Sequence, residues 1–564
     1  MSRKTLLFAG LLIGIVQAAC NESGYDVAPR ATLNEVASQA VFSVYLHDAP
    51  ADYDEVNIEI RKVSIWHTNN IENKVIIGEP EKLFNILELV NGQRALLGEA
   101  DVEAGTYNRI ELLLGDGHSV VSDGIVHDLV LTGENEVTIN MNVQVSEHGQ
   151  YEVNLDFDAM KSVLKNGSVY ELNPSVRAYQ KENTVTLKGR VVADNHSAIV
   201  TARQLGSDFT STRTEKGIGE FKLMGLNWGV YQQVNITPLD DEYPAVTRSN
   251  MILNQEDVEV SLGTILLGES KLLNTGEGWL RRDLSPGVEL LEKHYDDFDG
   301  HPRFFHIIAV DNSKPEIEVG IHIPLFWFNT PHRAPISDFG KHAEALAATN
   351  AGFAPGGSGY FNYGIIKIDG RVYPYVQKGT DEYWDDLLVD RHFFGSSAVG
   401  IDYEGNWHFR QREGDTWDDE WPEMRHAIAG GHRVLKDGEI MENIAQGTYE
   451  NDLERRHIMT QHPRTALCHT ADDVVALFAI DGRFNQAVGM SLLEMAEFML
   501  DLGCVDAINF DGGGSTTMWT REFGVVNHPT DNSQFNHEGE RNLRNAFIIM
   551  DQESGTSTGI DDPY

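Results

Sequence analysis

Hydrophobic and polar positions alternate along the first third of the chain. From Val41 onward apolar residues recur at every second position, and similar runs follow at residues 107–114, 137–145 and 151–157. A period of two is typical of strands that bury one face. The pattern therefore predicts an all-β domain of the sandwich type, and a second all-β unit follows it.

A helical period separates two short apolar runs near the end of the chain. The runs cover residues 474–480 and 505–510, and the segment between them begins with an S-x-x-E capping box made by Ser491 and Glu494. Strand, helix and strand over this length predict a crossover between parallel strands. The C-terminal ends of such strands lie at one edge, where α/β folds bind ligands. We therefore expect Asp481 and Asp511, which follow the two runs, to lie close together.

A glycine-rich loop follows Asp511. Gly512, Gly513 and Gly514 allow backbone N–H groups to approach a ligand, and Ser515 and Thr516 add hydroxyl groups. The alternative is a tight turn without a chemical role. No Lys follows the glycines, so the loop does not fit a Walker-type phosphate site.

Length and charge limit the classes of function. The chain has 564 residues, which predicts about three or four domains. Its net charge of −42 repels nucleic acid and anionic membranes, so neither is expected as a partner. An anionic substrate would have to be bound by a local cluster of basic residues.

The N-terminus has the pattern of an export signal. Arg3 and Lys4 precede an apolar run that ends in small residues, and Cys20 follows where bacterial lipoproteins carry their lipid. We therefore expect export across the inner membrane and a location in the cell envelope, with a lipid anchor as the only membrane contact. Simple secretion is the alternative. Cys468 and Cys504 stand in apolar contexts and are expected to be buried free thiols.

The fold class expected from these patterns is multidomain, with two N-terminal all-β, sandwich-like domains and a C-terminal α+β domain that contains a mixed sheet. The expected divisions are a signal peptide (1–19), a tether (20–37), a β-sandwich (38–182), a β module (183–267), a linker (268–287), the α+β domain (288–550) and a disordered tail (551–564).

Three parts of the chain resemble known families. Residues 38–182 resemble a β domain of unknown function from bacterial surface lipoproteins, and residues 219–238 resemble the prealbumin-like modules that accompany carboxypeptidases. The α+β domain is similar to the phosphodiester glycosidase family in six ordered segments: ATNAGFA, AGGHRVLKDGE, HPRTAL, IDGR, NFDGGGSTTM and GVVNHPTDNSQFNHEGERNLRNAF. This resemblance implies a hydrolase that cleaves the glycosidic bond of a sugar-1-phosphodiester, of the N-acetylglucosamine type, or of a related surface glycan.

The chemistry of that reaction suggests roles for particular residues. A carboxylate stabilises or attacks the oxocarbenium-like carbon, for which Asp511 is the first choice and Asp481 the second, while Glu540 is a candidate base for water. A phosphate leaving group needs its charge neutralised, which arginine does best. The arginines in the matching segments are Arg464, Arg483 and Arg541.

Asn350, Thr465 and His432 complete the candidate binding set, with purely structural roles as the alternative for each. No His/Cys spacing predicts a transition-metal site. A hard divalent cation such as calcium, held by the three candidate carboxylates, stays open as a cofactor. The alternative functions are a glycosidase acting on acidic, non-phosphorylated polysaccharide and a non-catalytic glycan-binding lipoprotein.

Overall fold

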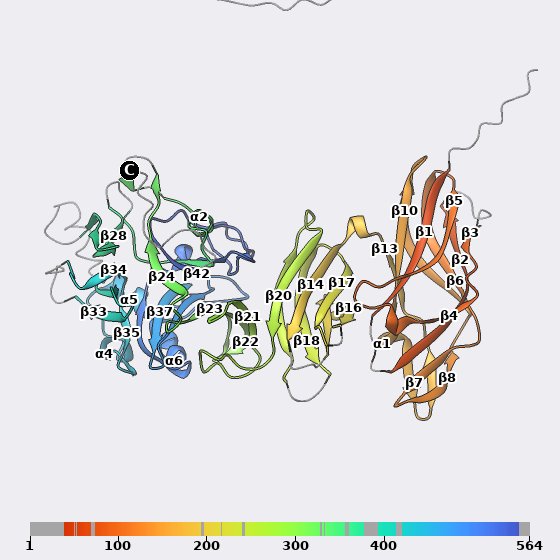
Figure 1. Cartoon of the computed structure of the whole chain (residues 1–564), viewed down its shortest axis with the longest axis horizontal. Helices are drawn as coiled ribbons and strands as arrows, with labels where there is room; N and C mark the ends of the chain where they lie inside the picture. The colour runs from red at the N-terminus through yellow and green to blue at the C-terminus, as the bar shows by residue number, and fades with distance from the viewer. Residues whose placement is uncertain are drawn as a thin grey trace, which may run out of the picture.

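The computed structural model describes residues 39–551, except 50, 52, 69–73, 193–196, 216, 240–242, 327–329, 332, 356–359, 377–392 and 413–419. The expected signal peptide and tether, and with them Cys20, lie outside the described residues. The same holds for the expected tail, except for its first residue, Asp551. Three units follow one another in a row along the long axis of the molecule (Figure 1).

The N-terminal unit is a β-sandwich, as the alternation predicted. Its smaller sheet has the order β13-β10-β1-β5 and its larger sheet the order β11-β12-β8-β7-β2-β6-β9, and side chains of both sheets share one core. The strands are β1 (Ala40–Ala49), β2 (Glu55–His67), β5 (Ala95–Val102), β6 (Gly105–Leu114), β7 (Ser119–Ser122), β8 (Ile125–Leu131), β9 (Glu136–Val145), β10 (Gln150–Asp158), β11 (Val163–Asn166), β12 (Val169–Leu172) and β13 (Val176–Tyr179).

The middle unit, like the first, is built mainly of strands. A four-stranded sheet of order β16-β15-β18-β19 packs on β17, β14 and β20 around a core of its own. The strands are β14 (Val185–Val192), β15 (Ala198–Gln204), β16 (Ser207–Arg213), β17 (Glu220–Leu226), β18 (Gly229–Pro238), β19 (Val246–Leu253) and β20 (Glu259–Leu266).

The C-terminal unit contains several sheets and a few short helices, which agrees with the expected α+β class. The described strands of its larger sheets pair antiparallel, so the mixed sheet expected from the sequence is corrected. Its largest sheet continues from the middle unit in the order β17-β14-β20-β21-β22-β23-β38-β37-β39-β35-β36. These strands are β21 (Leu280–Ser285), β22 (Val288–Phe298), β23 (His301–Asp311), β38 (Val474–Ile480), β37 (Arg464–Thr470), β39 (Cys504–Asn509), β35 (Arg433–Lys436) and β36 (Glu439–Ile440).

Two five-stranded sheets, in the orders β24-β42-β27-β40-β41 and β30-β29-β34-β32-β33, lie in the same unit. Two two-stranded sheets accompany them, β25 (Leu325–Phe326) with β26 (Thr330–Pro331) and β28 (Asn362–Tyr363) with β31 (Tyr375–Val376). The strands of the five-stranded sheets are β24 (Ile317–His322), β42 (Ala546–Asp551), β27 (Ala347–Asn350), β40 (Met518–Thr520), β41 (Gly524–Val525), β30 (Arg371–Val372), β29 (Ile366–Ile368), β34 (Met424–Ala429), β32 (Ser397–Asp402) and β33 (Trp407–Gln411).

The described α-helices of this unit are α2 (Ile336–His342), α4 (Glu442–Ala445), α5 (Asp452–Met459) and α6 (Leu492–Asp501). Within the described ranges no helix has the length and apolarity that a membrane span requires.

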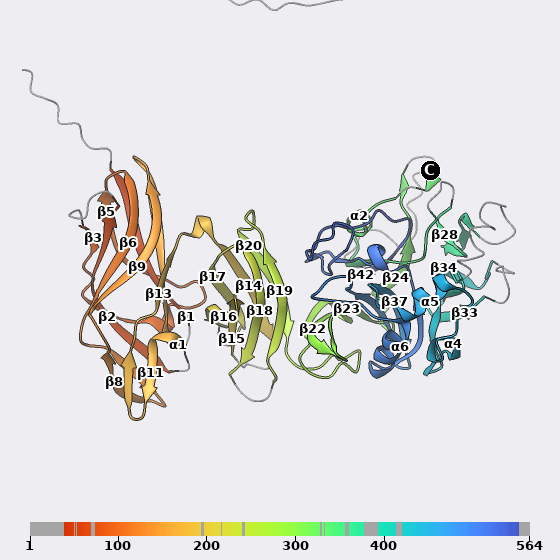
Figure 2. The ribbon, with the colours of Figure 1, turned by 180° about the vertical axis from the view of Figure 1, so that it is seen from behind.

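The predicted strand–helix–strand unit is present. Strands β38 and β39 both pair antiparallel with β37, which lies between them, and they therefore run parallel to each other. Helix α6 connects them and packs its apolar side on the sheet (Figure 2). Ser491 and Glu494 form the expected capping box at its N-terminus. Asp481 and Asp511 thus follow strands that end at the same edge.

The segment predicted as a linker, 268–287, is part of this sheet. It contains β21, which pairs with β22 along its length and meets β20 at Leu266 and Arg281. Trp279 in the same segment is buried, and its indole N–H donates to the Thr275 carbonyl over 3.0 Å. The interpretation of this segment as a connecting linker is corrected, because β21 pairs within the sheet. The turn-rich composition of the segment gave no sign of this strand.

The expectation of free thiols was wrong. Cys468 on β37 and Cys504 on β39 are joined by a disulfide, with a Cα–Cα distance of 5.8 Å. The two strands are neighbours in the sheet although the cysteines are 36 residues apart, which only the pairing of the strands reveals.

The disulfide predicts the labelling behaviour of these cysteines. In denatured but unreduced protein we expect Cys468 and Cys504 to resist alkylation, and both to be labelled after reduction, as read by peptide mass spectrometry. Reduction is expected to lower the free energy of unfolding by about 2–4 kcal/mol because it releases a long closed loop. Full labelling of both cysteines before any reductant is added would contradict the assignment.

Candidate active site

The loop after β39 is held in place by a buried amide. Asn350, at the end of β27, donates from Nδ2 to the carbonyl of Asp511 over 2.5 Å. Its Oδ1 accepts from Thr465 Oγ1 at 2.7 Å and from the Thr517 N–H at 3.1 Å. Asn350 and Thr465 are buried and their polar atoms are used within the protein. They position the loop, and the expected contact of these two side chains with substrate stays a prediction.

The glycines allow this loop to pass close to neighbouring groups. Gly513 has φ +63°, and a β-carbon there would lie 2.6 Å from Nη2 of Arg483. The Gly513 N–H donates to the Pro463 carbonyl over 2.9 Å and so cannot serve a ligand. Within the described part of the chain, the N–H groups of Gly512 and Gly514 have no backbone partner, which keeps them as candidate donors.

Two of the predicted arginines lie over the loop. A β-carbon at Gly514 would lie 2.1 Å from Nη2 of Arg541, and Arg483 approaches Gly513 from the exposed side. Arg541 donates two parallel hydrogen bonds of 2.8 Å to Asp531 and one of 3.2 Å to Ser515 Oγ. This fork fixes the plane of the guanidinium group. Asp531 stands in a segment that matched the family, but nothing in the sequence marked it as the partner of Arg541.

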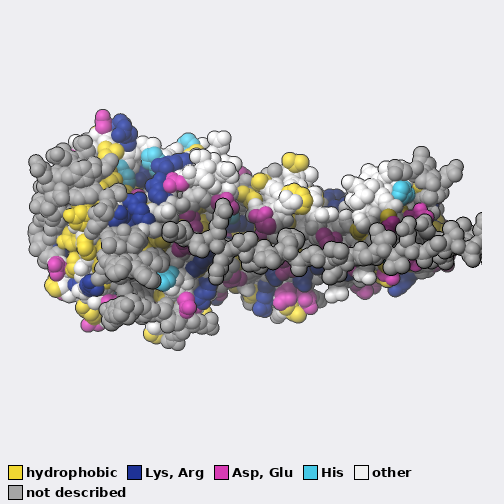
Figure 3. Space-filling model, turned by 90° about the horizontal axis from the view of Figure 1, so that it is seen from above, with side chains coloured by type: hydrophobic (Ala, Val, Ile, Leu, Met, Phe, Trp, Pro, Cys, Tyr) yellow, Lys and Arg dark blue, Asp and Glu magenta, His cyan; other side chains and the backbone are white. Residues whose placement is uncertain are grey.

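Arg333 is a third cation near Asp511 and was missed by the sequence analysis. Its positive charge acts on the Asp511 carboxyl, and its guanidinium donates to the Pro355 carbonyl over 3.0 Å. It stands outside all six matching segments, so no sequence signal distinguished it from other exposed arginines. Side chains of Lys and Arg gather on the face of the C-terminal unit that Figure 3 shows from above.

Asp511 is the carboxyl group whose ionisation is disfavoured. Although the residue keeps partial access to solvent, burial by the surrounding protein raises its pKa to about 6. A hydrogen bond from Ser515 and the charges of Arg541 and Arg333 oppose this shift without cancelling it. A carboxyl group with a pKa near neutrality can exchange a proton or act as a nucleophile at physiological pH.

Asp481 has a different environment from Asp511. It is buried and accepts hydrogen bonds from His306 Nε2 (3.0 Å), His528 Nδ1 (2.6 Å), the His528 N–H (2.9 Å) and Asn527 Nδ2 (3.2 Å). Burial alone would raise its pKa, but His528 and His306 outweigh that effect and hold the pKa well below its usual range. These contacts enclose the carboxylate, and they do not support the second-choice role of nucleophile expected from the sequence.

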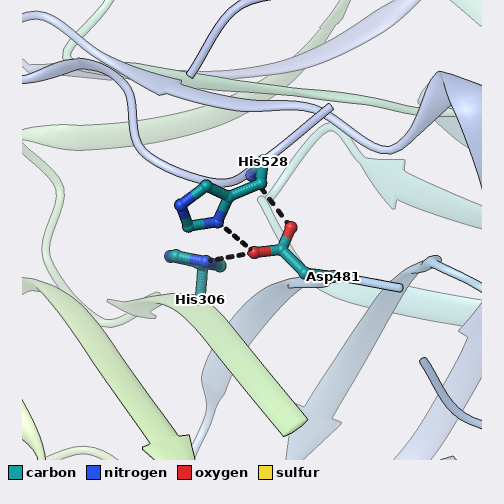
Figure 4. Close-up of side chains that lie close together, drawn as sticks. All are labelled: His306, Asp481 and His528. Carbon is teal, nitrogen blue, oxygen red and sulfur yellow. Dashed lines mark hydrogen bonds and ion pairs between the residues drawn. The ribbon is translucent and has the colours of Figure 1, made fainter. Parts of the chain in front are cut away.

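The two histidines around Asp481 were not selected from the sequence. His306 stands in the strongly apolar strand β23, where a lone polar residue is the only signal, and His528 lies within a matching segment. Figure 4 shows both rings directed at the Asp481 carboxylate from separate parts of the chain.

Arg464 is held by backbone carbonyl groups, which does not support the phosphate-binding role expected from the sequence. Its buried guanidinium donates to three carbonyl oxygens, those of Met490 (2.7 Å), His457 (2.8 Å) and Thr460 (2.8 Å). Burial lowers its pKa to about 9, so the group stays charged at neutral pH. The sequence could not distinguish this role from phosphate binding, because both use the same donors.

Glu540 and His432 also have structural contacts. Glu540 accepts the Ser337 N–H on Oε1 over 2.9 Å at the start of helix α2. His432 is buried, lies 2.9 Å from Glu454 and stacks on Phe393 with ring centroids 5.3 Å apart. These contacts are structural, and the roles of Glu540 as a base and of His432 in binding stay predictions.

The three candidate carboxylates do not form a calcium site in the described residues. Asp481 is enclosed by histidines, and Glu540 caps a helix. The one group of metal-ligand type found among the described residues is His306, Asp481 and His528.

Comparison with known proteins supports the family resemblance. Residues 343–550 match the model of the phosphodiester glycosidase family, and residues 39–174 match a domain of unknown function (DUF4382). Two of the three resemblances expected from the sequence are confirmed for these residues, that to the phosphodiester glycosidase family and that to the domain of unknown function. The resemblance of residues 219–238 to prealbumin-like modules stays a prediction.

Individual relatives match over shorter segments. Human N-acetylglucosamine-1-phosphodiester alpha-N-acetylglucosaminidase is 32% identical over 114 residues, which is 19% of this chain and 22% of that protein. An uncharacterised protein, YomE, of Bacillus subtilis is 32% identical over 92 residues, 16% of this chain and 13% of that protein. The chain thus spans about a fifth of the length of the human relative.

Among solved structures, the catalytic domain of the zebrafish N-acetylglucosamine-1-phosphodiester alpha-N-acetylglucosaminidase has a TM-score of 0.38 and 23% identity, covering 48% of this chain and 86% of that one. A hypothetical protein from Synechocystis has a TM-score of 0.35 and 11% identity, covering 80% and 97%.

The raised pKa of Asp511 predicts a pH-dependent gain of stability in Asp511→Asn. The folded pKa of about 6 lies above the ordinary value of 3.8, so ionisation of Asp511 costs stability above pH 6 and costs nothing below about pH 4. We expect Asp511→Asn to be more stable than the wild type by about 1–3 kcal/mol at pH 7.5 and equal to it at pH 4, as measured by chemical denaturation.

Asp531→Asn is the matched control for this prediction. It also removes a carboxylate near the loop, but this one is the partner of Arg541, so its loss is expected to bring no gain at pH 7.5. A difference between Asp511→Asn and wild type that stays constant from pH 4 to pH 7.5 would contradict the raised pKa.

Proposed function

We propose that the protein is a cell-envelope hydrolase that cleaves the glycosidic bond of a sugar-1-phosphodiester. The observation that carries this proposal is the placement of Asp511, with its raised pKa, beside Arg541, Arg483 and Arg333. In a protein of net charge −42, a local group of three arginines around a carboxyl group favours an anionic substrate. The match of residues 343–550 to the phosphodiester glycosidase family agrees with it.

In this proposal Asp511 acts at the anomeric carbon. Its carboxylate stabilises the oxocarbenium-like state or attacks C1, as the bond to the phosphate oxygen breaks. A phosphomonoester departs as a stable anion and needs no carboxylic acid to protonate it. This agrees with the structure, in which Asp481 and Glu540 are occupied elsewhere.

The arginines act on the leaving group. Asp531 fixes the orientation of the Arg541 guanidinium through two hydrogen bonds, and Arg483 lies next to Gly513. In this proposal both cations contact the phosphate group, on which negative charge accumulates as the bond breaks. Charge neutralisation by fixed donors lowers the barrier because the donors need no reorganisation during the reaction. Arg333 adds a third positive charge on the Pro355 side of the loop.

An envelope location with a lipid on Cys20 is part of the proposal. The export pattern at the N-terminus motivates it, and the Cys468–Cys504 disulfide supports it, because such bonds persist in oxidising compartments. We expect the mature protein to begin at Cys20 with a lipid attached, which mass spectrometry of its N-terminal peptide measures. An unprocessed N-terminus in membrane-fractionated protein would contradict this.

Product analysis tests the reaction. When purified mature protein is incubated with an N-acetylglucosamine-1-phosphodiester, we expect phosphorus and proton NMR to show free sugar and a phosphomonoester. Asp511→Asn is expected to lower kcat by about 10³-fold, and Arg541→Ala to lower kcat/KM for the phosphodiester by about 10²-fold, because each removes a group that stabilises the transition state.

Arg425→Ala is the matched control, since Arg425 pairs with Glu318 and Asp369 on another sheet of the same unit and is expected to leave turnover unchanged. If sugar is released from an acidic, non-phosphorylated polysaccharide while the phosphodiester is not cleaved, the substrate class is acidic glycans instead. If the protein binds sugar but forms no product after long incubation, the proposal that it is a hydrolase is wrong.

A further inference from the structure

Three buried side chains of metal-ligand type meet behind the Asp511 loop. His306 comes from the middle of β23, Asp481 follows β38 directly, and His528 follows β41, so three distant segments supply one residue each (Figure 4). Their exposed fractions are 0%, 1% and 2%. One ligand atom of each residue lies within 4.8 Å of the other two.

The ligand atoms converge on one carboxylate oxygen. His306 Nε2 lies 3.0 Å from Asp481 Oδ2, and His528 Nδ1 lies 2.6 Å from the same oxygen. The other oxygen, Oδ1, accepts the His528 N–H and the Asn527 amide, which fixes the plane of the carboxylate. The arrangement leaves Oδ2 and the two ring nitrogens directed into the same small space.

The surroundings of His306 favour an ion in that space. Its other ring nitrogen, Nδ1, lies 3.3 Å from Glu292 Oε1, and Glu292 is itself held by Arg248 and Arg282. When a neutral His306 ring carries its proton on Nε2, the Nδ1 lone pair faces this carboxylate and repels it. A metal ion on Nε2 moves the proton to Nδ1, which can then donate to Glu292. A carboxylate behind the second nitrogen is the usual support of a metal-binding histidine.

We propose that His306, Asp481 and His528 bind one divalent transition-metal ion of the zinc class. Two imidazoles and one carboxylate suit zinc and its first-row neighbours, whereas calcium and magnesium prefer oxygen ligands alone. With metal–ligand distances of about 2.0–2.1 Å, the two nitrogen–oxygen separations open to roughly 3.3 Å in a tetrahedral site. Small rotations of the side chains provide this change.

The ion has a structural role in this proposal. Asn527, next to His528, accepts the Met518 N–H over 2.8 Å and donates to the Thr516 carbonyl over 3.1 Å. An ion that holds His528 therefore also holds the strand and loop that lead away from Asp511. Because Arg248 belongs to β19 of the middle unit, the site also links that unit to the catalytic one.

Metal analysis of the full mature chain tests the proposal without any substrate. Protein purified without chelators is expected to contain one equivalent of a transition metal by plasma mass spectrometry. Protein stripped with a chelator is expected to bind one equivalent of added Zn²⁺ and to gain about 5 °C or more in Tm. Added Ca²⁺ is expected to produce no shift.

Two variants distinguish a metal site at His306, Asp481 and His528 from a network of hydrogen bonds alone. His528→Gln keeps a hydrogen-bond donor for Asp481 but removes a good metal ligand, so we expect it to fold, to contain no metal and to lose the Zn²⁺ response. His408→Ala is the matched control, because His408 forms a similar contact of 2.9 Å with Asp402 on an exposed hairpin. It is expected to keep one equivalent of metal.

Wild-type protein that is folded, free of metal and unaffected by Zn²⁺ would overturn the proposal and leave a network of hydrogen bonds. Metal that persists in His528→Gln would overturn the assignment of these ligands. If that variant does not fold, the Zn²⁺ response of the stripped wild type decides the question.

Discussion

The position of one strand, β37, determines the geometry of the candidate site. Because β38 and β39 both pair with it in antiparallel fashion, they run parallel to each other and end at the same edge of the sheet. Helix α6 makes the connection between them, and the Cys468–Cys504 disulfide joins β37 to β39. Two acidic residues separated by 30 positions in the sequence are thereby brought to one edge with little freedom to move apart.

The same edge gives these two carboxyl groups opposite properties. Asp481 is enclosed by four hydrogen-bond donors and is held in its ionised form. Asp511 is surrounded by protein with few donors, so its ionisation is disfavoured despite the nearby arginines. Pairs of acidic groups whose pKa values are driven apart often mark a site where one group reacts and the other supports it. Here the supporting carboxylate anchors the segment that leads to Asn527 and the loop after Asp511.

The C-terminal unit is not isolated from the β units. The large sheet passes from β20 through β21 into β22, and Arg248 of the middle unit reaches Glu292 behind His306. At the other boundary, Asp156 of the N-terminal sandwich accepts from Thr210 at 2.9 Å, while Arg177 donates to the Gly225 carbonyl at 2.6 Å. Hydrogen bonds and shared strands of this kind restrict relative motion of the described units.

The sequence by itself determined the features that depend on local patterns. Alternation predicted the strands of the sandwich, the capping box of Ser491 and Glu494 predicted α6, and the ordered motifs predicted the glycosidase domain and the Asp511 loop. These follow from side-chain periodicity, backbone capping and glycine content, which act over a few residues. The sequence also selected Arg464, Arg483 and Arg541 as candidate phosphate-binding residues, because the residue type alone indicates that chemistry.

Only the tertiary structure decided which of the candidate residues are held by partners inside the protein. Arg464, Glu540 and Asp481 have the right chemistry, but their partners are backbone groups and histidines brought in from distant segments. Burial and hydrogen bonding depend on which strands are neighbours, and strand order across such separations is not encoded in any local pattern. For the same reason, only the assembled sheets show that His306 and His528 contact Asp481 and that Arg333 lies near Asp511.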